Sequence, residues 1–117
     1  MKQLTTAEVI DLFNKAFQIH DATLLNELID ENCVMEGADN LITTGFTECY
    51  KFWETLINTH NTQFRPEKIV VLGEKATVQW EFLWGDNLEN STRGINLMTI
   101  SNSKITEAIG YVKGNLS

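Results

Sequence analysis

The first apolar positions of the chain recur at intervals of three and four residues, which is the spacing of one face of an α-helix. The residues on this face are Val9, Ile10, Phe13, Ala16 and Phe17. Thr5 lies three residues before Glu8, the arrangement of a capping box at a helix N-terminus. The pattern predicts an amphipathic helix over about residues 6–20.

A second short helix and a strand are expected next. Asp21 is a residue type that caps helices. The apolar positions that follow it are Leu24, Leu25, Leu28 and Ile29. The polar run 30–32 should end this helix, and residues 33–36 have the composition of a short strand.

Residues 37–45 are expected to form a loop, after which helical spacing returns. From Phe46 onward one helix face would carry Tyr50, Trp53, Leu56, Ile57 and His60. A third helix with an apolar face is therefore predicted.

From Gln63 the period of the apolar pattern changes from that of a helix to that of a strand. Turn-forming segments at 73–75, 85–90 and 101–104 separate four stretches rich in β-branched and aromatic residues. Pro66 cannot donate a hydrogen bond to a neighbouring strand, so a bulge or a sheet edge is expected there. Helices followed by an antiparallel meander define an α+β fold.

The two faces of this predicted sheet differ in composition. Because strand side chains alternate, one face carries Val78, Trp80, Phe82 and Trp84 and is strongly aromatic. The other face retains Ile95, Leu97, Ile109 and Tyr111. This is more apolar surface than a monomer usually exposes, so we expect a homodimer that packs through the outer face of the sheet.

Composition narrows the class of protein. The 117 residues suit one domain spanning 1–117. The net charge of −7, with nine scattered Lys and Arg, gives nucleic acid little to bind. No apolar run is long enough for a membrane span, and residues 1–6 do not resemble a secretion signal. A cytoplasmic location is therefore expected.

The cysteines and histidines offer no cofactor chemistry. Cys33 and Cys49 lack the spacing of a metal site and are expected to be reduced and buried. His20 and His60 have no Cys or Ser placed beside them as a nucleophile. No phosphate-binding loop or dinucleotide fingerprint is found either. We expect no metal and no cofactor.

The order of elements, with Gly45 before the third helix and a final strand over 105–112, resembles the nuclear transport factor 2-like superfamily. Within it the order of the Asp-rich turn, the first strand, the third helix and the segment Ile95-Asn96-Leu97-Met98 is most similar to ketosteroid isomerases and SnoaL-like polyketide cyclases. The resemblance implies a cone-shaped fold, with three N-terminal helices against a curved, mostly antiparallel sheet. It also implies a pocket for a small apolar molecule.

The resemblance also implies where a site would lie. The expected pocket residues are Trp53, Ile57, His60, Trp80, Phe82, Trp84 and Val112. Ketosteroid isomerases carry a carboxylate base at the end of the first strand, where Gly37 stands here. Glu36 is the candidate base if a bulge or a shifted register turns it inward, and Asp39 is the candidate if the loop folds over the mouth. Asn96 occupies the place of the family's hydrogen-bonding aspartic acid and would donate from its amide.

Three functions remain open at this point. The first is an isomerase, cyclase or dehydratase without a cofactor, moving a proton on a small apolar carbonyl compound through Glu36 or Asp39. Ketosteroid isomerases also hold the substrate oxyanion with a tyrosine of the first helix. This chain has tyrosine only at Tyr50 and Tyr111, which speaks against steroid isomerisation as that family performs it. The second is a binding module for an apolar ligand, and the third a dimeric assembly protein with a closed pocket. Limonene epoxide hydrolases share the fold, but Arg93-Gly94-Ile95 lacks their Arg-x-Asp step.

Overall fold

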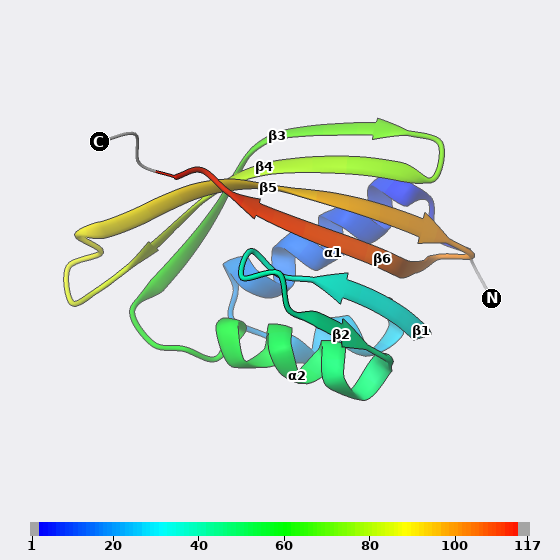
Figure 1. The fold of residues 1–117 in the computed structure, drawn as a ribbon, viewed down its shortest axis with the longest axis horizontal. Coiled ribbons are helices and arrows are strands. Elements are labelled where there is room, and N and C mark those ends of the chain that lie inside the picture. The colour runs from blue at the N-terminus through cyan, green and yellow to red at the C-terminus, as the bar shows by residue number, and fades with distance from the viewer. Residues whose placement is uncertain (1–2, 115–117) are drawn as a thin grey trace.

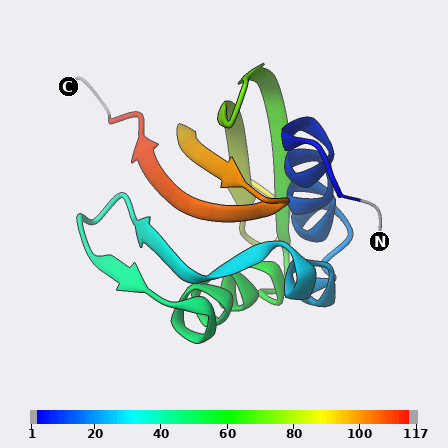
Figure 2. The same ribbon diagram turned by 90° about the vertical axis from the view of Figure 1, so that its right-hand side faces the viewer.

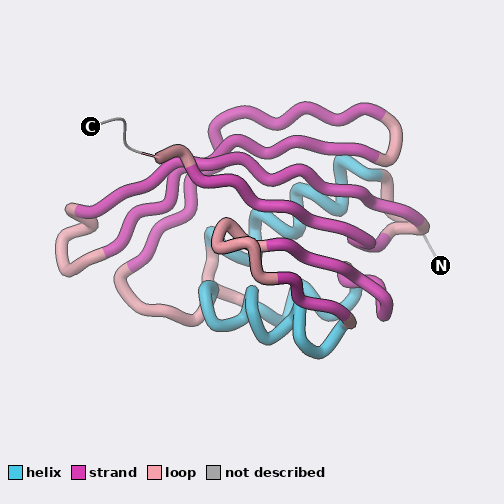
Figure 3. The backbone as a smooth tube through the Cα atoms, viewed as in Figure 1, coloured by secondary structure: helices cyan, strands magenta, loops and turns pink. Residues whose placement is uncertain are grey.

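The computed structural model describes residues 3–114, which form one six-stranded sheet curved around two α-helices and a short 3₁₀-helix (Figures 1 and 3). The strand order is β2-β1-β6-β5-β4-β3. All neighbouring strands are antiparallel except β1 and β6, which are parallel. The predicted α+β class and the mostly antiparallel sheet are confirmed.

Helix α1 (Thr6–Gln18) begins where the capping box predicts. The Thr5 side chain accepts a hydrogen bond from the Glu8 amide at 3.1 Å, and Glu8 accepts one from the Thr5 amide at 2.9 Å. The predicted apolar face is buried. The helix ends two residues before the predicted His20, which has a φ of 57° and so leaves the helical conformation.

The second helical segment is shorter than predicted. It is a 3₁₀-helix, η1 (Ala22–Glu27), capped by Asp21, whose carboxylate accepts from the Thr23 amide at 3.0 Å. Leu28 and Ile29 are buried outside it, and Ile29 begins β1 (Ile29–Glu36). The polar residues 30–32 do not end a helix. They fall where the pairing of β1 with β6 shifts register, between Ile29 and Val34.

The predicted loop 37–45 contains a strand that the sequence pattern did not show. β2 (Ile42–Thr44) pairs with the end of β1 as an edge hairpin. Its three residues are too few to display a period, and Ile42 and the preceding Leu41 are both more than half exposed. A tight turn closes the hairpin, with the Gly37 amide donating to the Leu41 carbonyl at 3.0 Å.

Helix α2 (Phe46–Ile57) follows Gly45, whose φ of 93° is a conformation that favours glycine. Cys49, Trp53 and Ile57 are its buried residues. The predicted helical face is therefore correct, although the helix ends three residues before His60.

The remaining strands are β3 (Thr62–Leu72), β4 (Lys75–Trp84), β5 (Asn90–Ser101) and β6 (Lys104–Val112). Pro66 opposes Trp80 and Lys68 opposes Gln79, so Glu67 is an extra residue in a bulge on the edge strand. Both expectations for Pro66 are confirmed. The sheet curls in the second view so that its inner face encloses the space beside α1 and α2 (Figure 2).

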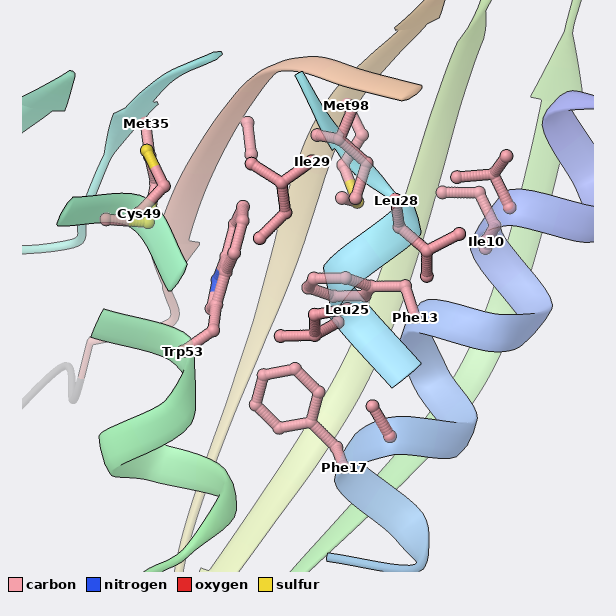
Figure 4. Close-up of a cluster of buried hydrophobic side chains, with 14 of the residues drawn as sticks. Ile10, Phe13, Phe17, Leu25, Leu28, Ile29, Met35, Cys49, Trp53 and Met98 are labelled. Atoms are coloured by element: carbon pink, nitrogen blue, oxygen red, sulfur yellow. The ribbon is translucent and has the colours of Figure 1, made fainter. Parts of the chain in front are cut away.

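One apolar cluster joins the inner face of the sheet to the helices. Phe13 and Phe17 of α1 point toward Trp53 of α2, with Leu25 and Ile29 between the layers (Figure 4). The Phe13 and Trp53 rings meet edge to face, with centroids 5.1 Å apart. The hydrophobic effect and this aromatic packing hold the helices on the sheet.

Candidate functional site

A pocket of about 230 Å³ lies between the inner face of the sheet and the two α-helices. Most of its lining side chains are apolar. They come from α1 (Phe13, Phe17), α2 (Phe52, Trp53, Leu56), β1 (Met35), β3 (Phe64), β4 (Trp80, Phe82) and β6 (Ala108, Val112). Glu36, Gly37, Ala38, Thr92, Asn96 and Gly110 complete the wall.

A continuous row of aromatic rings forms the inner wall of the pocket. Phe13 lies 5.1 Å from Phe17, Phe17 lies 5.2 Å from Phe64, and Phe64 lies 6.3 Å from Trp80, measured between ring centroids. These separations are those at which aromatic pairs attract one another. Because Phe64 and Phe13 are nearly fully buried, the wall is held firmly in place.

Asn96 lines the pocket as expected, and Thr92 is another polar residue of its wall. Asn96 stands on β5 between Val78 of β4 and Gly110 of β6. Its amide makes no hydrogen bond to any residue in the range 3–114. A half-buried amide without a protein partner is free to bond a molecule in the pocket.

Two indole N–H groups of the pocket also lack protein acceptors. Trp80 Nε1 is buried and unpartnered among the described residues. The nitrogen of Trp53 lies on the side of its ring away from Phe13 (Figure 4), and no hydrogen bond from it is formed within residues 3–114. Both donors stand in a wall that is mostly apolar, apart from Thr92, Asn96 and the Glu36 main chain.

Glu36, a candidate base, is not turned into the pocket. Met35 opposes Ala108 and lines the pocket, whereas Glu36 opposes Ile109. Because successive side chains of a strand alternate, the Glu36 carboxylate is directed to the outer face. The Glu36 main chain reaches the wall, with its carbonyl oxygen 3.9 Å from where a Cβ on Gly110 would lie. The register shift in β1 occurs before Val34 and does not turn Glu36 inward.

Asp39, the other candidate base, is exposed and does not line the pocket. Its Oδ1 accepts a hydrogen bond from the Leu41 amide at 3.0 Å, which fixes the turn between β1 and β2. The same oxygen lies 3.0 Å from the position that a Cβ on Gly37 would take. Gly37 does line the pocket, so the Asp39 carboxylate stands just outside the wall.

Three other predicted pocket residues lie elsewhere. Ile57 is 1% exposed and belongs to the core below the pocket. His60 is exposed beyond the end of α2. Trp84 shares the inner face with Phe82, but it stands at the far end of β4 and is 40% exposed. Trp53, Trp80, Phe82 and Val112 line the pocket as predicted.

Sequence reasoning missed the pocket contribution of α1 and of Phe64 on β3, and it did not assign Met35, Phe52, Leu56 or Thr92 to the pocket. Phe13 and Phe17 were assigned only to the packing face of their helix, and Phe64 precedes the proline that disrupts the strand pattern. The signal available was the alternation of β3, which places Phe64 opposite Phe82 on the inner face. Nothing in the periodicity distinguished helix residues that pack from those that line a cavity.

The cysteines are free and buried, as expected. Cys49 donates its thiol hydrogen toward the carbonyl oxygens of Cys33 and Thr43, each at 3.6 Å. Burial and the neighbouring Cys49 raise the pKa of the Cys33 thiol to about 12. A thiol that stays protonated is a poor nucleophile, so Cys33 acts as a core residue.

No metal site or membrane helix is found in the described part of the chain. Within residues 3–114 no group of three or more His, Cys, Asp or Glu side chains is arranged to hold a metal ion. Among the same residues, no helix combines the length and the apolar character that a bilayer crossing requires.

The curved sheet, its enclosed helices and the pocket between them define a protein of the nuclear transport factor 2-like class. A family model described as a SnoaL-like domain matches residues 9–108. The chain belongs to the SnoaL-like family. No curated protein matches the sequence.

Solved structures agree with this assignment. A nuclear transport factor 2-like protein of unknown function from Mesorhizobium loti is 38% identical, with a TM-score of 0.88 over 93% of this chain and 91% of that chain. A candidate ketosteroid isomerase from Kribbella flavida DSM 17836 is 12% identical, with a TM-score of 0.82 over 96% and 80% of the two chains. A candidate polyketide cyclase from Sinorhizobium meliloti is 15% identical, with a TM-score of 0.75 over 92% and 99%. The last two likenesses show the fold alone.

Proposed function

We propose that this protein binds a small apolar molecule in the pocket between the sheet and the helices. The observation that carries the proposal is an aromatic pocket whose hydrogen-bonding groups are free: the amide of Asn96 has no partner in residues 3–114, and neither has the indole of Trp80. Ligand sites of soluble proteins are mostly apolar clefts with a few polar groups of this kind.

The arrangement favours binding over proton transfer. Glu36 is directed to the outer face, and Asp39 is held in its turn by the Leu41 amide. A general base has to lie within hydrogen-bond reach of the proton that it removes. The pocket therefore has donors that can hold an oxygen atom of a ligand but no carboxylate directed into it.

A binding experiment tests this proposal. A panel of apolar one-ring and two-ring compounds would be screened by thermal denaturation, and hits measured by calorimetry on the protein and on two variants. Trp80→Ala should weaken binding about tenfold or more, since it removes part of the pocket wall. Glu36→Gln should bind as the parent does. Equal affinity for the parent and Trp80→Ala would contradict the proposal.

Proton transfer on a small carbonyl compound is the second candidate, and one observation favours it. Asp39 Oδ1 lies 3.0 Å from the Cβ position of Gly37, the pocket residue where ketosteroid isomerases carry their base. A movement of the turn would bring this carboxylate to the wall. Exchange of α-hydrogens of a bound ketone with deuterated water, abolished by Asp39→Asn but not by Glu36→Gln, would establish this reaction. Absence of exchange in the parent protein excludes it.

A further inference from the structure

Two glycines on the inner face of the sheet shape the floor of the pocket. Gly94 lies between Trp80 and Val112 in one cross-strand row, and Gly110 lies next to Asn96 in the adjoining row. Because side chains opposite one another across a sheet share one face, the missing side chains leave space on the pocket side.

The indole of Trp80 occupies the space above Gly94. A Cβ on Gly94 would stand 2.5 Å from Cζ2 of Trp80 and 2.7 Å from Cη2, closer than atoms can approach. The six-membered ring therefore lies over the glycine backbone, against the sheet. Trp80 is half-buried and lines the pocket, so it offers an aromatic surface as part of the floor.

The amide of Asn96 leans over Gly110 in the same way. Its Oδ1 lies 3.3 Å from the position of a Cβ on Gly110. With the oxygen turned toward Gly110, the Nδ2 hydrogens are left for an acceptor in the pocket. Trp80 Nε1 is a second donor without an acceptor among residues 3–114, but it is fully buried. Asn96 is therefore the donor that an oxygen atom of a ligand in the pocket can reach, because Trp80 Nε1 is closed off from solvent.

The volume of the pocket limits the size of that ligand. A protein cavity of about 150 Å³ holds benzene, so a pocket of about 230 Å³ scales to about nine non-hydrogen atoms. That is one ring with a short substituent. A four-ring steroid is larger than this volume and would have to extend out of the open mouth of the pocket.

We propose that the ligand is a planar one-ring compound that stacks on Trp80 and places a single oxygen acceptor at the Asn96 amide. The inference rests on the proposed function, because it takes the pocket to be a binding site. It adds the size class, the shape and the two residues that select the ligand. Gly94 and Gly110 are positioning residues, since each acts through the side chain that lies over it.

Acetophenone and α-methylstyrene are matched probes for the acceptor. They have the same shape and the same number of non-hydrogen atoms, and differ in a carbonyl oxygen that replaces a methylene group. Calorimetry should show acetophenone binding about tenfold more tightly, the effect of one good hydrogen bond. In Asn96→Leu the two affinities should become equal while α-methylstyrene still binds. Equal affinities in the parent protein, or an unchanged preference in Asn96→Leu, would overturn the proposal.

Larger ketones test the size limit and separate this inference from the proposed function. A 4-ene-3-keto steroid should bind more weakly than acetophenone. If the steroid binds more tightly in the pocket, the one-ring inference fails and the proposed function stands. If no apolar compound binds at all, both fail.

The glycines provide a test of positioning. Gly94→Ala should reduce acetophenone affinity about tenfold, because the new methyl group displaces the indole. Its Cβ also approaches the Tyr111 carbonyl oxygen, so Gly110→Ala, whose nearest contact is the movable Asn96 amide, is tested beside it. Gly114→Ala is the control, since nothing lies within 4 Å of its Cβ position. Unaltered affinity in both Gly94→Ala and Gly110→Ala, with their folds retained, would show that the glycines do not position Trp80 and Asn96 for binding.

Discussion

The imidazole of His20 is bound to the last residue of α2: its Nδ1 lies 2.7 Å from the carbonyl oxygen of Ile57. Nε2 lies 3.2 Å from the carbonyl oxygen of Thr62 at the start of β3. A neutral imidazole carries one N–H and donates to one carbonyl, so the shorter contact links the histidine that follows α1 to the end of α2. α1 and β3 carry Phe17 and Phe64, which line the pocket.

Replacing His20 should destabilise the fold. His20→Asn tolerates the φ of 57° but has a shorter side chain that should not reach the Ile57 carbonyl, and it should lower the free energy of unfolding by about 1–3 kcal/mol. His20→Ala should cost about 1 kcal/mol more, because alanine resists the left-handed conformation. Urea unfolding measures both values. Parental stability in both variants would show that the two contacts contribute nothing.

Asn14 is the buried polar side chain of α1, and neither of its amide atoms has a hydrogen-bond partner in the described structure. Leucine has nearly the same shape without the polar atoms. Asn14→Leu should therefore raise the free energy of unfolding by about 1–3 kcal/mol, the penalty of an unpaired buried group. Asn14→Asp, which buries a charge at the same place, should lower it. A less stable Asn14→Leu would mean that the amide is satisfied in solution.

The two cysteines should be unreactive in the folded protein. Burial raises the pKa of Cys33 to about 12 and also raises the pKa of Cys49. Since the thiolate is the reactive form, a disulfide reagent at pH 8 should modify both residues only after denaturation. Rapid modification of either thiol in the native state would contradict this expectation.

The raised pKa of Cys33 also predicts a loss of stability in alkali. Its thiol keeps its proton up to about 12 in the folded protein, whereas the ordinary value is 9.0. Between these values the unfolded chain binds fewer protons than the folded one, so stability falls as the pH rises. Cys33→Ala should show a smaller fall over that range in urea unfolding. If the free energy of unfolding fell equally steeply with pH in the two proteins, a group other than Cys33 would cause the loss of stability in alkali.

The outer face of the sheet keeps the apolar surface from which a homodimer is predicted. Leu97 and Tyr111 are 38% and 53% exposed there, and Val34 on β1 is 38% exposed. Light scattering after size exclusion should give about twice the 13.3 kDa of one chain. Leu97→Glu should give the single-chain mass, and Leu72→Glu at the sheet edge should not. A single-chain mass for the parent protein at micromolar concentration would refute the dimer.

Much of the fold follows from periodicity because both helices and the long strands are half-buried. The helical stripe of α1 and the alternation around Trp80 each face one core, so pattern and structure coincide. β2 was missed because a three-residue edge strand with exposed apolar residues has no buried face to generate a pattern. The register shift in β1 likewise depends on its parallel partner β6, which lies far along the chain.

The site was predicted in part for the same reason. Trp80 and Asn96 were placed correctly because strand alternation fixes their face. Ile57 and His60 were not, because a helical stripe does not show where packing ends and a cavity begins. The direction of Glu36 required the observed pairing with Ile109, since a slip of one residue reverses the face.

The most direct test of ligand binding in the pocket is a nuclear magnetic resonance titration of the nitrogen-15-labelled protein with acetophenone. Binding in the pocket predicts saturable shifts of the Asn96 side-chain amide and of the Trp80 indole N–H, with no shift at Leu72 on the exposed edge of the sheet. Saturable shifts confined to the outer face, or unchanged Asn96 and Trp80 signals at saturation, would contradict the claim that this pocket binds the ligand.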